Sequence, residues 1–135
     1  MNTVSYLFWL TKMAFSVVVY AWFISVPLFA ACVIATVRAW RVGDRDGRAK
    51  IRGLRALYCF PAFMLILGTI FRKHPAVWLN YGVWGFMILL VCLGIVLVVR
   101  LRGVRLAASS HMLVVIWLSL CSLFVAGMSI SDDWL

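Results

Sequence analysis

The feature that most constrains this chain is a run of 25 residues, Met13–Val37, that contains no charged side chain. As a helix it extends about 37 Å, enough to cross the roughly 30 Å hydrocarbon core of a bilayer with some tilt. Three further uncharged runs cover residues 56–71, 76–99 and 106–131. We therefore expect an all-α fold, with residues 1–135 forming a single four-span transmembrane domain, an integral membrane four-helix bundle.

Two basic segments, 38–55 and 100–105, separate these runs and carry ten of the thirteen lysine and arginine residues. Because positive residues concentrate in cytoplasmic loops, we expect both segments in the cytoplasm and both termini on the non-cytoplasmic side. The protein is then a multi-pass protein of the cell inner (plasma) membrane. A net charge of +9 would suggest nucleic acid as the partner of a soluble protein. Here the charge sits in loops, so we expect no nucleic acid.

The arginines of the first basic segment recur every three or four residues, which places them on one face of any helix they form. Gly43 to Gly47 indicates a turn, and Asp46 could cap a helix that returns to the membrane. Orientation alone explains the segment; the alternative is contact with anionic lipid head groups or an acidic partner. The candidate contact residues, including three in the turn before the third run, are Arg38, Arg41, Arg45, Arg48, Arg52, Arg55, Arg72, Lys73 and His74.

The sequence contains few acidic residues. The sequence has no glutamate, and its four aspartates all lie in loops or near the C-terminus. No uncharged run therefore holds the carboxylate that proton-coupled exporters use, or a carboxylate pair for acid–base catalysis. No serine–histidine–aspartate set, glycine-rich phosphate loop or zinc motif occurs. These features favour a non-enzymatic protein without cofactor or metal.

Each uncharged run carries one cysteine. They are Cys32, Cys59, Cys92 and Cys121. Counted from the basic segments, Cys121 lies about 24 Å deep and the other three roughly 6–12 Å deep, so all four cannot meet. The sequence therefore favours buried free thiols over a metal site.

The histidines and the deeper tryptophans leave a question open. His74 and His111 are expected on opposite sides of the membrane, so they cannot share a ligand. Trp22, Trp84 and Trp117 lie deeper than an interfacial aromatic belt. They either pack between helices or line a pocket for a quinone or pigment.

Small residues recur within the uncharged runs, and small residues let membrane helices approach closely. They pack either against the other helices of this chain or against a partner chain. The predicted packing residues are Ala31, Ala35, Gly82, Gly85, Ser119, Ser122, Ala126 and Ser129.

Several short patterns resemble one family of small membrane proteins. Lys12 precedes Trp22-Phe23 in the first run, Pro61 precedes Gly68 in the second, and Trp78-Leu79 opens the third. In these respects the chain resembles the HemJ-type and CopD-like family of small four-span membrane proteins. The resemblance implies the four-span architecture. It does not imply haem, copper or oxidase activity, because Phe15 stands where that family has its first-span histidine.

We expect an integral membrane subunit or accessory protein that packs its helices against a partner in a larger assembly. Three alternatives stay open. The chain could form a small-solute or ion pathway as a homo-oligomer, act as a membrane immunity protein against a pore-forming toxin, or be a haem- or redox-linked membrane protein.

Overall fold

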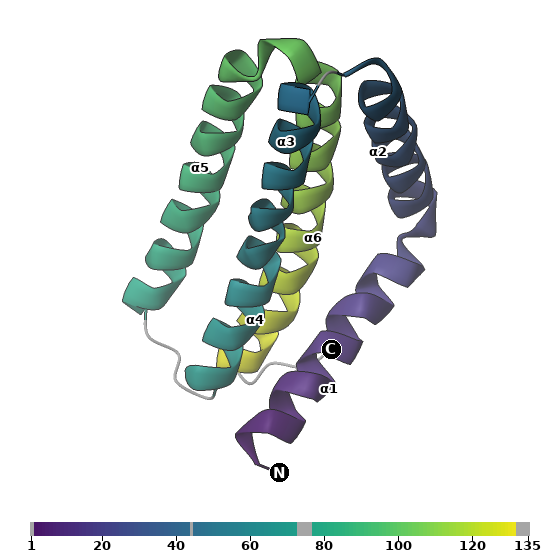
Figure 1. Cartoon of the computed structure of the whole chain (residues 1–135). Helices are drawn as coiled ribbons and strands as arrows, with labels where there is room; N and C mark the ends of the chain where they lie inside the picture. Colours follow the sequence, from purple (N-terminus) through teal and green to yellow (C-terminus); the bar gives the residue numbers. More distant parts are fainter. Residues whose placement is uncertain (1, 44, 73–76, 132–135) are drawn as a thin grey trace.

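The computed structural model describes residues 2–43, 45–72 and 77–131, with side chains beyond Arg72 resuming at Tyr81, and the described chain is all-α (Figure 1). Lys73 and His74 lie outside the described residues. The helices are α1 (Thr3–Tyr20), α2 (Trp22–Val42), α3 (Arg45–Gly53), α4 (Cys59–Ile70), α5 (Val77–Arg100) and α6 (Arg105–Ser131). Two short 3₁₀ turns, η1 (Leu54–Tyr58) and η2 (Arg102–Val104), join α3 to α4 and precede α6.

Five helical segments of the described chain, rather than the expected four, are long and apolar enough to cross a membrane. They are Thr3–Tyr20, Trp22–Val42, Arg45–Ile70, Tyr81–Arg100 and Arg102–Ser131. The prediction of four was wrong because Met13–Val37 was read as one helix. Helical structure begins at Thr3, inside the short uncharged stretch before Lys12, and it breaks at Ala21.

The break at Ala21 is stabilised by polar groups inside the bundle. The Ser25 hydroxyl donates to the carbonyl of Val18 (2.8 Å), which lies just before the break. The same hydroxyl oxygen accepts the indole N–H of Trp117 from α6 (3.0 Å). Backbone polar groups within a membrane must be satisfied internally, so these bonds make an interrupted helix tolerable there.

α1 and α2 run in series beside α6. Tyr6 in α1 is hydrogen-bonded to Ser129, near the end of α6, and Thr36 in α2 to His111, near its start. As one straight helix, Tyr6 to Thr36 would extend about 45 Å, whereas His111 to Ser129 extends about 27 Å. The break and the oblique course of α1 in Figure 1 accommodate the difference.

The first basic segment, expected as a loop, is largely helical. α2 continues to Val42, and α3 begins at Arg45, so the change of direction falls between these two helices. Gly43 suits this turn because a Cβ there would lie 2.5 Å from the carbonyl oxygen of Ala39. Asp46 lies in the first turn of α3, inside the helix rather than at its cap, and pairs with Lys50.

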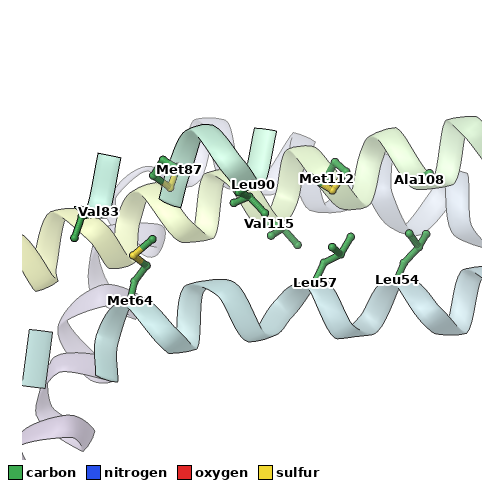
Figure 2. Packing of buried hydrophobic residues seen from close by; sticks show 9 residues of the cluster. All are labelled: Leu54, Leu57, Met64, Val83, Met87, Leu90, Ala108, Met112 and Val115. Carbon is green, nitrogen blue, oxygen red and sulfur yellow. The ribbon is translucent and has the colours of Figure 1, made fainter. Parts of the chain in front are cut away.

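α6 is the central helix and contacts α1, α2, α4 and α5. Figure 2 shows how α6 shares its main hydrophobic cluster with α5 and the α3–η1–α4 segment. That cluster consists of Leu54, Leu57, Met64, Val83, Met87, Leu90, Ala108, Met112 and Val115. A second cluster joins α1 to α4 and α6 through Tyr6, Leu10, Ala14, Leu65 and Val125.

α4 approaches α6 closely at Gly68. A Cβ at that position would lie 2.8 Å from both Cα and Cβ of Ala126. Two small residues thus let the helices meet nearly backbone to backbone, as membrane helix packing favours.

Candidate functional site

The bundle has two chemically different ends. At the basic end, α3 contacts η2, which brings residues of the two basic segments together. At the opposite end, the guanidinium group of Arg72 lies 4.1 Å from the centre of the Tyr6 ring, beside the end of α6. The sequence predicted this separation of charge along the bundle, while the side of the membrane that each end faces stays a prediction.

An open cavity of about 540 Å³ lies at the basic end between the end of α2 and α3. Three arginines of α3 line it, Arg45, Arg48 and Arg52, together with Trp40 and Gly43. The Arg48 guanidinium lies 5.7 Å from the centre of the Trp40 ring, in cation–π range. The three guanidinium groups make this cavity cationic.

Next to this cavity, on the side towards the middle of the bundle, a chain of hydrogen bonds links α2, α6 and η1. Thr36 Oγ1 donates to the carbonyl of Cys32 (2.7 Å), so the same oxygen must accept from His111 Nε2 (3.1 Å). His111 therefore carries a proton at Nε2, and its Nδ1 is hydrogen-bonded to the Tyr58 hydroxyl (2.9 Å). The imidazole thus bridges α2 and η1.

Two smaller cavities follow: a middle one along α2, and an inner one between Phe29 of α2 and the helices α1, α4 and α6. The middle cavity, about 290 Å³, is lined by Thr36, Tyr58 and His111 and by the apolar side chains of Phe29 and Val33, among others. The inner cavity, about 260 Å³, is almost wholly apolar and shares Phe29 with the middle one. Trp40 of the basic cavity lies one helical turn beyond Thr36. We call the three cavities together the α2 groove.

A second polar cluster closes the opposite end. The Ser129 hydroxyl donates to the carbonyl of Gly68 (2.8 Å), so Tyr6 must be the donor in its 2.7 Å bond to Ser129. Tyr6 and Ser129 are buried, and the Tyr6 ring also stacks on Trp9. Together these contacts fix α1, α4 and α6 to one another.

The predicted packing residues divide into two groups. Ala35 and the four on α6, Ser119, Ser122, Ala126 and Ser129, are buried within the chain. Ala31, Gly82 and Gly85 are exposed on the surface of the bundle. The serines of α6 therefore face the interior of this chain.

The three deep tryptophans do not share one pocket. Trp22 and Trp84 are 65% and 55% exposed on the surface of the bundle, whereas Trp117 bonds to Ser25. The exposed rings of Trp22 and Trp84 lie on the surface that would contact lipid. The pocket suggested by the sequence therefore does not form within the described chain.

The cysteines and His111 offer little to a metal. Cys32 and Cys121 are buried, and Cys59 and Cys92 are exposed. No group of three potential ligands from His, Cys, Asp or Glu occurs among the described residues. Both nitrogens of His111 are engaged, and Phe15 is exposed on α1, so these positions do not fit the axial ligands of a haem.

Sequence reasoning placed His111 only by its side of the membrane and missed Thr36 and Tyr58. The available signal was depth, because all three lie within a few residues of a basic segment. Polar side chains at the same depth in different membrane helices are candidates for one network.

No family model, curated protein or solved structure matches the chain. The resemblance to the HemJ-type and CopD-like family therefore stays a prediction. What the chain can do must be argued from its own geometry.

Proposed function

We propose that the protein is a non-enzymatic integral membrane subunit that packs α5 against a transmembrane helix of a partner. The observation that carries this proposal is that α5 buries one side against the bundle and exposes large side chains elsewhere. From Tyr81 onwards, its fully buried residues form one stripe directed at the bundle, Val83, Met87, Leu90 and Gly94. In Figure 1 the helix stands at the edge of the bundle, and many of its other described side chains, including Tyr81, Trp84 and Ile88, are exposed.

Two exposed glycines, Gly82 and Gly85, leave a notch between larger side chains on the outer surface of α5. A Cβ added at Gly82 or Gly85 would meet no atom within 4 Å. Bulky exposed side chains, Tyr81, Trp84 and Ile88, flank the two glycines. Membrane helices associate through close contact at small residues, so this surface suits a second helix.

The homo-oligomeric pathway receives no comparable support. A helix face of small and hydroxyl residues, such as that of α6, could line a pathway between copies. Ser119, Ser122 and Ser129 are buried within one chain, and Ser129 is hydrogen-bonded there.

A photo-cross-linking amino acid placed at Ile88 tests the proposal, with the same group at Ile34 on the exposed face of α2 as control. In native membranes, Ile88 should give one discrete adduct with another polypeptide, and Ile34 should not. Gly85→Leu should reduce the adduct by filling the notch, whereas Gly127→Leu, at an equally open glycine of α6, should leave it unchanged. Adducts with lipid only would contradict the proposal, and an adduct of two copies of the chain would favour an oligomer.

A further inference from the structure

We propose that the α2 groove binds a membrane phospholipid, with its phosphate among Arg45, Arg48 and Arg52 and one acyl chain lying along α2 towards Phe29. This assignment goes beyond the proposed role of α5, which lies elsewhere on the bundle. It rests on a change of chemistry from the basic end towards Phe29 of α2: the basic cavity is cationic, whereas the middle and inner cavities are almost wholly apolar. A phospholipid has the same order of groups from head to tail.

The charge at the basic cavity suits a phosphate. Arginine presents a planar fork of N–H donors that matches phosphate oxygens, and three arginines converge on this cavity. Trp40 also lines this cavity, and the Arg48 guanidinium lies over its ring. Tryptophan is enriched at the depth of lipid head groups, so the cavity and the interface coincide.

The length of the groove matches one leaflet. From Trp40 to Phe29 the axis of α2 advances about 16 Å, and half of the hydrocarbon core measures about 15 Å. An acyl chain whose head group lies at the arginines would therefore reach Phe29 and the edge of the inner cavity. Val33 lines the middle of this path.

The wall of the groove is held in place before any lipid arrives. His111 bonds to Thr36 of α2 and to Tyr58 of η1, so the two sides of the middle cavity cannot separate without breaking this chain. A preformed site avoids part of the ordering cost of binding.

A lipid fits better than an acidic peptide. The groove continues from the basic end to the depth of the membrane, where a peptide backbone would need partners for its N–H and C=O groups. The inner cavity is lined almost entirely by apolar side chains, which offer few such partners. An acyl chain needs none.

Native mass spectrometry of the full chain in neutral detergent tests the site. The probes are phosphatidylglycerol and phosphatidylcholine with identical acyl chains, and glycerol 3-phosphate as a head group without a chain. The wild type should retain one phosphatidylglycerol in preference to phosphatidylcholine, and glycerol 3-phosphate should not displace it. Full displacement by glycerol 3-phosphate would show an anion site without a chain groove.

Two matched pairs of variants locate the lipid. Retention of phosphatidylglycerol should fall on the order of tenfold in Arg45→Gln/Arg48→Gln/Arg52→Gln. It should persist in the control triple of equal charge at the same end, Arg100→Gln/Arg102→Gln/Arg105→Gln. Equal loss in both triples would reduce the effect to general surface charge and overturn the site.

The second pair tests the acyl path and leaves every arginine in place. Val33→Trp fills the groove and should lower retention, whereas Ile34→Trp, next along α2 and outside the middle cavity, should not. Retention that is unaffected by Val33→Trp would contradict the placement of the chain.

Discussion

At the scale of single residues, buried hydroxyl groups divide into those with partners and one without. Ser129 takes part in two hydrogen bonds that join three helices. Ser119, on the same helix and equally buried, has a hydroxyl with no hydrogen-bond partner within the described chain. The two serines therefore form a matched pair for measuring what a buried hydroxyl contributes.

Ser129→Ala should lower the free energy of unfolding by about 1–3 kcal/mol, because it leaves the buried Tyr6 hydroxyl without its acceptor. Ser119→Ala should leave that free energy unchanged or raise it by up to about 1 kcal/mol, since an unpaired buried hydroxyl is removed. Unfolding by SDS titration in mixed micelles measures both values. Equal losses in the two variants would show that the hydroxyl contacts are assigned wrongly.

Residue-level reasoning from sequence located the arginines of the α2 groove but not the hydrogen-bonded side chains beside its middle cavity. Arg45, Arg48 and Arg52 were visible from their spacing. The link between Thr36, Tyr58 and His111 was not, because it depends on which helices are neighbours and how they are rotated. Spacing along one helix cannot supply that information.

At the scale of elements, the packing of α4 on α6 depends on Gly68. Gly68→Ala should lower the free energy of unfolding by about 1–3 kcal/mol, since its Cβ would overlap the backbone of Ala126. Adding Ala126→Gly should restore part of the loss by removing one of the two clashing atoms.

The control for this prediction is Gly127→Ala, next to Ala126 on α6, where a Cβ meets nothing within 4 Å. That change should be neutral or slightly stabilising, because alanine favours helix over glycine by about 1 kcal/mol. The same SDS titration measures all the variants. If Gly68→Ala proved as harmless as Gly127→Ala, the close approach of α4 and α6 would be refuted.

Hydrophobicity alone predicted that helices form, but not where one breaks or continues. Uncharged runs predicted helices, and helices formed. The break at Ala21 depends on Ser25 meeting Trp117 of a distant helix, so no local pattern marks it. Helical continuation from Arg45 through η1 into α4 was obscured by two glycines and six charged residues, Arg45, Asp46, Arg48, Lys50, Arg52 and Arg55, which suggested a loop.

At the scale of the whole molecule, composition predicted an all-α, membrane-spanning class of protein, and the described helices agree with that class. Charge distribution predicted that the two basic segments share an end. The central place of α6 could not be predicted, because four similar uncharged runs can be ordered around a bundle in many ways. That order in turn decides which side chains line the α2 groove.

We predict that the basic end faces the cytoplasm and that the Tyr6–Ser129 end faces the other side of one membrane. Cysteine accessibility in intact cells tests it, after the four native cysteines are replaced by alanine. Gly43→Cys and Gly103→Cys should be protected from an impermeant thiol reagent, and Ser131→Cys should be labelled. Labelling at Gly43→Cys with Ser131→Cys protected would contradict the orientation, and labelling of both in intact cells would contradict the separation of the two ends by a membrane.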